Sequence, residues 1–272
     1  MGYNFKRHIY DLLPPLVKRG IGLAPFSMIA GKHYRRVLQD QRKFETAALS
    51  DIRDYQEQKL GVMLDFATQM VPAYANHKGV VSRHSALDAL KDFPFIRKED
   101  IQENIYSYLP KNFESIPHYE CTTGGTSGNQ LKFYLDDYSQ SVETAFMHRQ
   151  WQRVGYTPNC RKATFRGVNF PKLREDIYWN YNPVYNELQF SPFNMTEKNL
   201  AAYVEKIIQY RPMYFHGYPS AIDTLAEYIL RMDISNLFTG IRAILLGSEA
   251  CTLAQRDRIE RAFKTRVFTW FG

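Results

Sequence analysis

Residues 241–249 read IRAILLGSE, an apolar run that ends in Gly-Ser-Glu. A run of this kind, without polar alternation, is typical of a strand that is covered on both faces, as in a parallel sheet. Both flanking segments have helical patterns. Ile222 to Leu230 repeats its apolar residues at helical spacing, and Thr252 to Gln255 matches the capping box that opens a helix. The stretch therefore predicts a buried strand between two helices.

The same alternation continues outward from this strand. Thr196 is expected to cap an amphipathic helix, Met213 to Phe215 reads as a short apolar strand, and Thr265 to Trp270 as a last strand. A further strand is expected at Lys162 to Val168. Alternating helices and strands predict an α/β fold, in which a parallel sheet has helices on its faces.

Three turns would meet at one edge of this sheet, because ligands of such folds bind outside the carboxyl ends of the strands. These turns are Gly217 to Ser220, Gly247 to Glu249, and the end of the last strand at Gly272. For any one of them, a glycine that merely lets the chain turn is the simpler explanation. Three such turns at one edge favour a binding site.

The first half of the chain is predicted to be mainly helical, and two strands that flank a loop and a further helix are expected to follow it. Helices are expected at Phe44 to Val71, after the capping box Ser85 to Asp88, at Lys98 to Tyr106 and at Ser139 to Val154, with strands at His118 to Cys121 and Leu131 to Leu135. The predicted organisation is a basic N-terminal segment at 1–43, a helical region at 44–115 that packs on the main domain, and an αβ nucleotide- or acyl-binding portion at 116–272.

The composition indicates a soluble globular protein. Hydrophobic residues at 44% and aromatic residues at 15% are too frequent for a disordered chain. No apolar run approaches the length of a membrane span, we find no signal peptide, and three widely spaced cysteines do not suggest a disulfide framework. A cytoplasmic location is the expectation.

The net charge of +7 is concentrated in residues 1–43, which hold nine Lys or Arg against two Asp. Apolar residues accompany these charges, so a weak peripheral contact with an anionic membrane is one interpretation. A segment that packs on the main body with a solvated basic face is the simpler one. No nucleic-acid-binding motif accompanies the charge, so no nucleic-acid partner is expected.

The loop at 122–128 reads TTGGTSG and carries the clearest chemical signal. Glycines allow close backbone approach, and hydroxyl and backbone N–H groups are the donors that surround phosphate oxygens. It is not a Walker A loop, because no Gly-Lys-Ser/Thr follows and the next element reads as a strand. From composition alone, a hairpin tip without a ligand remains an equal alternative.

Together with its surroundings, this loop resembles the phosphate loop of the adenylate-forming (acyl-CoA synthetase) superfamily. The chain is similar to the branch of phenylacetate–CoA ligase and the capsular polysaccharide biosynthesis proteins. The resemblance rests on an ordered set of motifs: Val71 to Tyr74, Phe93 to Ile101, Thr123 to Lys132, Gly217 to Ser220, Gly247 to Glu249, and Phe271-Gly272.

The resemblance implies an enzyme that activates a small-molecule carboxylate with ATP and Mg²⁺, through an acyl-adenylate, and passes the acyl group to a thiol such as coenzyme A. Carried over, the β- and γ-phosphates would be held by Thr123, Gly124, Gly125, Thr126, Ser127 and Gly128. The adenine and acyl pocket would be lined by Gly247, Ser248 and Glu249, and the strand-end motif beside the adenine would begin with Trp270, Phe271 and Gly272. The substrate pocket would add His216, Gly217 and Tyr218, although a lone histidine is more often structural.

Two departures from the family pattern concern Gln130, where a proline is usual, and the end of the given sequence at Gly272. The resemblance places a metal-handling glutamate, a ribose-binding aspartate and a catalytic lysine beyond that residue, so the 272-residue chain is expected to bind ATP without adenylating. The alternative is a non-catalytic nucleotide- or acyl-binding module, and a membrane-peripheral scaffold is a third, weaker reading. The aromatic residues of 177–193 are interpreted as packing rather than as an acyl pocket.

Overall fold

The computed structural model describes residues 10, 12–79, 85–123, 130–167 and 177–270. The chain forms two compact units, one of Met1–Asp11 with Arg36–Val142 and one of Leu12–Arg35 with Glu143–Gly272. Two helices, α4 (Gly31–Lys43) and α8 (Asp137–Gln152), contribute residues to both units. Within the described ranges, every helix is too short or too polar to cross a membrane.

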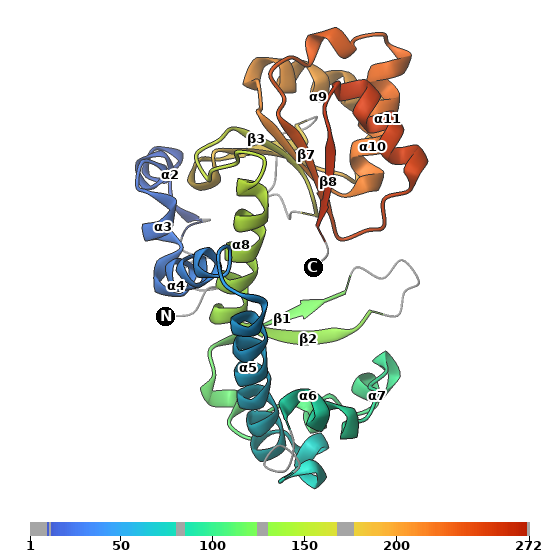
Figure 1. The fold of residues 1–272 in the computed structure, drawn as a ribbon. Coiled ribbons are helices and arrows are strands. Elements are labelled where there is room, and N and C mark those ends of the chain that lie inside the picture. The colour runs from blue at the N-terminus through green and yellow to red at the C-terminus, as the bar shows by residue number, and fades with distance from the viewer. Residues whose placement is uncertain (1–9, 11, 80–84, 124–129, 168–176, 271–272) are drawn as a thin grey trace. The chain divides into compact units, whose positions relative to one another are not determined.

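The unit that contains Arg36–Val142 is helical and ends in a hairpin (Figure 1). Its elements are α5 (Leu49–Met70), η1 (Pro72–His77), α6 (Ala86–Ala89), η2 (Leu90–Asp92), α7 (Lys98–Glu103), η3 (Ile105–Tyr108), η4 (Phe113–Ser115), β1 (His118–Thr122) and β2 (Lys132–Asp136). Strands β1 and β2 are antiparallel, with Thr122 opposite Lys132. The predicted hairpin is confirmed, and so is the cap of α6, where the Ser85 hydroxyl accepts from the backbone N–H of Asp88.

The long helix starts later than predicted. It begins at Leu49 rather than Phe44, because the chain turns after α4, where the backbone N–H of Glu45 donates to the carbonyl of Arg42. The ring of Phe44 lies 4.6 Å from the ring of Tyr55, so its apolar character reflects packing on α5 rather than helix periodicity. The helix predicted at Lys98 to Tyr106 is divided into α7 and the 3₁₀ turn η3.

The other unit is built on a six-stranded sheet (Figure 1). Its elements are α2 (Pro15–Gly22), α3 (Phe26–Ile29), β3 (Lys162–Phe165), β4 (Trp179–Asn182), η5 (Pro183–Tyr185), β5 (Glu187–Phe190), α9 (Glu197–Tyr210), β6 (Tyr214–Gly217), α10 (Pro219–Arg231), η6 (Ser235–Leu237), β7 (Ala243–Gly247), α11 (Leu253–Phe263) and β8 (Val267–Trp270). The strand order is β4-β5-β3-β6-β7-β8. The predicted α/β fold is confirmed.

The sheet is parallel except at one edge, where β4 runs antiparallel to β5. These two strands were missing from the prediction, which treated 177–193 as an aromatic cluster. Each spans only four residues, β4 contains two asparagines, and Pro183 and the left-handed Asn186 lie between the two strands. Phe190 is nonetheless fully buried against Phe165, so the packing interpretation was right for this ring.

Alternation along the strands divides the core into two layers. Phe215, Ile244 and Leu246 face a cluster that includes the buried sides of α9, α10 and α11. Tyr214 and Leu245 face the opposite way, in a cluster with Trp151 of α8 and with Tyr156, which follows that helix. A strand with both faces covered has little polar alternation, which explains the apolar stretch from Ala243 to Leu246 in β7.

Candidate functional site

Three strands end side by side at the carboxyl edge of the six-stranded sheet. Phe165 of β3 is in register with Gly217 of β6, and Gly217 is in register with Leu246 of β7. The residues that follow these strand ends are Arg166, Tyr218 and Ser248. The turns predicted at 217–220 and 247–249 therefore do lie on neighbouring strands, while Gly272 and Phe271 lie outside the described residues.

Arg166 joins the three strand ends, although the sequence analysis did not single it out. Its guanidinium donates to Oγ of Ser248 at 3.0 Å and to Nε2 of His216 at 3.3 Å, and it lies 6.0 Å from the ring centre of Tyr218. The predicted strand ran to Val168 and so placed Arg166 inside it. Since β3 ends at Phe165, the edge rule that selected the other turns would have selected Arg166 as well.

His216 is buried and accepts a hydrogen bond from Arg166 at the edge of the sheet. Its side chain is 5% exposed, and its ring makes an edge contact with Trp151 at 4.7 Å. Burial, followed by the charges of Lys162 and Arg166, lowers the pKa of His216 well below its usual value. The ring is therefore neutral: Nδ1 donates to the carbonyl of Leu245 at 2.9 Å, and Nε2 is left to accept from Arg166.

The guanidinium of Arg166 has more N–H donors than His216 and Ser248 use. Arginine presents five N–H groups, and the two neutral acceptors His216 and Ser248 use two of them. Among the described residues, no carboxylate is paired with Arg166, whose side chain is partly exposed. A half-buried cation that is positioned by neutral groups is suited to bind a phosphate or a carboxylate of a ligand.

Gly217 and Tyr218 lie close against the end of β3, the parallel neighbour of β6. A Cβ at Gly217 would lie 2.7 Å from the carbonyl oxygen of Phe165, so only glycine fits there. The hydroxyl of Tyr218 accepts a hydrogen bond from the backbone N–H of Gly167 at 3.2 Å. Both residues therefore fix the segment that carries Arg166.

The turn after β7 has an unusual backbone conformation. Ser248 has a φ of 68°, in the left-handed region that non-glycine residues rarely adopt. The next residue, Glu249, accepts a hydrogen bond from the backbone N–H of Ser220 at 3.2 Å, in the first turn of α10. A carboxylate at this place stabilises the positive end of the helix dipole, so Glu249 has a structural partner.

Gly247 and Trp270 end two neighbouring strands opposite each other. A Cβ at Gly247 would meet no atom closer than 3.5 Å, the distance to the carbonyl oxygen of Trp270, which is ordinary contact. Gly247 is therefore not required by packing.

In the other unit, Thr123 closes the base of the hairpin loop. Its backbone N–H donates to the carbonyl of Leu131 at 2.9 Å, and its Oγ1 accepts from the backbone N–H of Leu131 at 3.0 Å. Lys132, next on β2, is paired with Glu120 across the hairpin. The remaining predicted phosphate-loop residues lie outside the described part of the chain: Gly124, Gly125, Thr126, Ser127 and Gly128.

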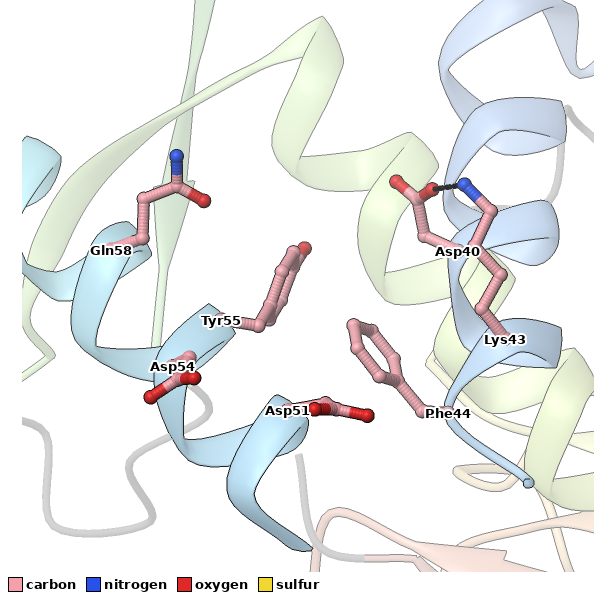
Figure 2. A pocket seen from close by; sticks show the side chains of 7 residues that line it. All are labelled: Asp40, Lys43, Phe44, Asp51, Asp54, Tyr55 and Gln58. Atoms are coloured by element: carbon pink, nitrogen blue, oxygen red, sulfur yellow. Dashed lines mark hydrogen bonds and ion pairs between the residues drawn. The ribbon is translucent and has the colours of Figure 1, made fainter. Parts of the chain in front are cut away.

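A pocket of about 600 Å³ lies in the same unit, between α4 and α5 (Figure 2). Its lining consists of Asp40, Lys43, Phe44, Asp51, Asp54, Tyr55 and Gln58, none of which the sequence analysis selected. Three carboxylates against one lysine would repel a nucleotide, so this pocket does not fit ATP. The described residues contain no cluster of three His, Cys, Asp or Glu that could hold a metal ion.

Comparison with solved structures identifies the fold. The chain superimposes on 2-hydroxyisobutyryl-CoA ligase in complex with 2-HIB-AMP, in the postadenylation state, with a TM-score of 0.60, 17% identity and coverage of 82% of this chain and 49% of that one. It matches the open conformation with 2-HIB-AMP and CoA at a TM-score of 0.59, 16% identity, and 82% and 54% coverage. The chain has the fold of these acyl-CoA ligases, which are adenylate-forming.

A sequence relative narrows the resemblance. The chain is 29% identical over 180 residues to Protein CapK of Staphylococcus aureus. The aligned region covers 65% of this chain and 39% of CapK. No family model matches. The chain thus spans about two fifths of this curated relative and about half of the solved ligases. Fold and sequence likeness together confirm the resemblance to the adenylate-forming superfamily, and the match to CapK fits its capsular branch.

Proposed function

We propose that this chain supplies the nucleotide- and acyl-binding part of an AMP-forming ligase, similar to phenylacetate–CoA ligase, that works in capsular or surface polysaccharide biosynthesis. In the proposed reaction a carboxylate oxygen attacks the α-phosphorus of ATP. Pyrophosphate leaves, and a thiol such as that of coenzyme A then takes the acyl group and releases AMP. Mg²⁺ would neutralise part of the phosphate charge.

The observation that carries the proposal is the arrangement of Arg166 on this fold. Neutral His216 and the hydroxyl of Ser248 hold the guanidinium at the carboxyl edge of a parallel sheet, where ligands of such sheets bind. We assign it to the phosphate next to the adenosine, where negative charge increases during attack. A cation that is already in position at that point stabilises the transition state more than the ground state.

The remaining predicted residues keep their roles as part of the proposal. The hairpin loop from Thr123 to Gly128 would bind the β- and γ-phosphates through backbone N–H and hydroxyl groups. The turn Gly247 to Glu249 and the strand end Trp270 to Gly272 would border the adenine. His216, Gly217 and Tyr218 act by positioning Arg166 and its strand end.

The test is calorimetric titration with AMP and adenosine, which differ by the phosphate assigned to Arg166. In Arg166→Gln the affinity for AMP should fall on the order of tenfold to a hundredfold, because a charge-assisted hydrogen bond is lost, while adenosine binding stays the same. Arg211→Gln, an exposed arginine of the same unit, is the matched control. Equal AMP affinities in Arg166→Gln and in the native chain would refute the assignment.

Carboxylate-dependent exchange of pyrophosphate into ATP separates the enzyme from the alternative. The 272-residue chain alone is expected to show no exchange, and exchange with any of a panel of aryl and short-chain acids in a longer form of the protein supports a ligase. Nucleotide binding without exchange, also in the longest form of the protein that can be expressed, supports a non-catalytic binding module. The membrane contact considered for residues 1–43 is a separate proposal and depends on other residues.

A further inference from the structure

The segment of α2 and α3 is anchored to the sheet-containing unit. Phe26 is 5% exposed and its ring lies 5.3 Å from Tyr34, 5.2 Å from His148 and 5.0 Å from Tyr185. Gly22 packs so closely on the turn η5 that a Cβ would lie 2.7 Å from the carbonyl oxygen of Pro183. The segment is therefore a fixed part of this unit.

The outer face of this anchored segment is apolar. Leu16 and Leu23 are 79% and 88% exposed, and they are joined by further exposed apolar side chains: Leu12, Val17, Met28 and Ile29. Leu16 and Arg19 of α2 and its C-cap residue Leu23, which keeps a helical backbone, follow the i, i+3, i+7 spacing and so share one face. Exposed apolar side chains that are concentrated in this way indicate a surface that is covered in use.

The charge of the same segment has one sign. Residues 12–35 contain four Lys or Arg and no Asp or Glu. Arg19 lies on the leucine face, Lys32 opens the next helix, and Arg35 donates to the carbonyl of Ser27 at 2.8 Å, which places its guanidinium beside α3. The partner must therefore carry negative charge and also accept leucine side chains.

We propose that α2 and α3 dock this protein on an anionic lipid surface. Lipid headgroups supply the negative charge, and the acyl boundary beneath them takes up the leucines, as for other amphipathic segments that lie in the interface. A second copy of the chain fits poorly, because the surface would meet its own positive charge. Nucleic acid would match the cations but would leave the leucines in water.

The experiment is co-sedimentation of the whole chain with vesicles of phosphatidylcholine alone, or with about one third phosphatidylglycerol. The native protein should sediment with the anionic vesicles at low salt, much less at high salt, and little with neutral vesicles. Absence of sedimentation with anionic vesicles at low salt would overturn the proposal, and so would equal binding to both vesicle types.

Two double variants locate the surface. Leu16→Ser with Leu23→Ser should weaken partitioning on the order of tenfold or more, since both side chains lose their apolar burial. Arg19→Gln with Lys32→Gln should weaken it roughly tenfold to thirtyfold at low salt. The charge-matched control is Arg211→Gln with Lys264→Gln, and the apolar control is Leu253→Ser, which is 86% exposed on α11.

Each variant has an outcome that contradicts the proposal. Native partitioning by the leucine variant or by the arginine–lysine variant would exclude this face, as would control variants that lose binding to the same extent. Sedimentation velocity without vesicles tests the second copy: self-association that disappears in Leu16→Ser with Leu23→Ser would show that the face is a homodimer interface instead. A native-like thermal transition confirms that each variant is folded.

Discussion

The guanidinium of Arg166 donates a hydrogen bond to Nε2 of His216, 3.3 Å away across two neighbouring strands. The other ring nitrogen donates to the carbonyl of Leu245, and burial lowers the pKa of His216 well below its usual value. The histidine is thus a neutral acceptor throughout the physiological pH range. It orients the arginine without competing with a ligand for its charge.

Replacing His216 with leucine should separate positioning from binding. The expected result is a several-fold loss of AMP affinity, on the order of the energy of one hydrogen bond, with adenosine affinity unchanged. Titration calorimetry measures both. His216→Asn, whose amide oxygen can accept from Arg166, should restore part of the AMP affinity. Equal losses for AMP and adenosine would indicate general damage to the fold rather than a role in orienting Arg166.

Two glycines of the sheet edge should respond differently to the same substitution. Gly217→Ala would force a Cβ to within 2.7 Å of the carbonyl oxygen of Phe165, so it should lower the free energy of unfolding by about 1–3 kcal/mol. Gly247→Ala meets its nearest atom at 3.5 Å and should change that free energy by less than about 0.5 kcal/mol. Urea unfolding of both variants checks the difference.

Ligand binding then distinguishes a structural from a functional glycine. If the turn after β7 borders the adenine, Gly247→Ala should lower adenosine affinity while leaving stability intact. A Gly217→Ala protein as stable as the native chain would contradict the close approach of β3 to β6 at Gly217.

Much of the fold follows from the sequence, because most of its elements have strong local patterns. The cap at Thr196 and the capping box at Thr252 are where they were predicted, and the strand predicted at 241–246 is β7, which begins two residues later, at Ala243. Strands β4 and β5 were missed, since four-residue strands interrupted by Pro183 carry too little periodicity to be recognised. Their burial comes from tertiary packing on β3, which a local pattern does not encode.

The site was only partly predictable for a related reason. The glycines and the Gly-Ser-Glu turn can be recognised in the sequence alone. Arg166 becomes a candidate only when β3 is known to end at Phe165. The neutral state of His216 depends on burial and on Lys162, which is distant in sequence. Such an environment is a property of the folded chain, so the residue type alone could not decide between a structural and a functional histidine.

A second buried histidine makes stability depend on pH. His148 is hydrogen-bonded to Tyr34 at 2.8 Å, and burial, assisted by the charge of Lys162, lowers its pKa to about 3. Below the ordinary histidine pKa of about 6.5, the unfolded chain takes up a proton that the folded chain does not. Stability should therefore fall as the pH drops through that value, by about 2 kcal/mol at about pH 5 for this one group.

The measurement is urea unfolding at about pH 7 and about pH 5. His148→Gln, which keeps a partner for Tyr34 but does not titrate, should be less stable at neutral pH and should lose less stability on acidification than the native chain. An unchanged pH dependence in His148→Gln would show that other groups account for the acid sensitivity, among them His216.

The role of the hairpin loop is tested by comparing the affinities of one variant for ATP and for AMP. In the proposed arrangement, Thr123 to Gly128 contacts only the β- and γ-phosphates, which AMP lacks. Gly125→Val adds a branched side chain, so the backbone can no longer approach phosphate oxygens closely, and Thr126→Val removes a hydroxyl donor. The affinity for ATP with Mg²⁺ should fall at least tenfold, on the order of one or two charge-assisted hydrogen bonds, while AMP affinity should stay within about twofold.

Because AMP binding depends on Arg166 in the other unit, it also reports that the variant is folded. Equal ATP affinity in the variant and the native chain would remove the phosphate assignment from this loop, and a parallel loss of ATP and AMP would show that the substitutions act on more than the loop.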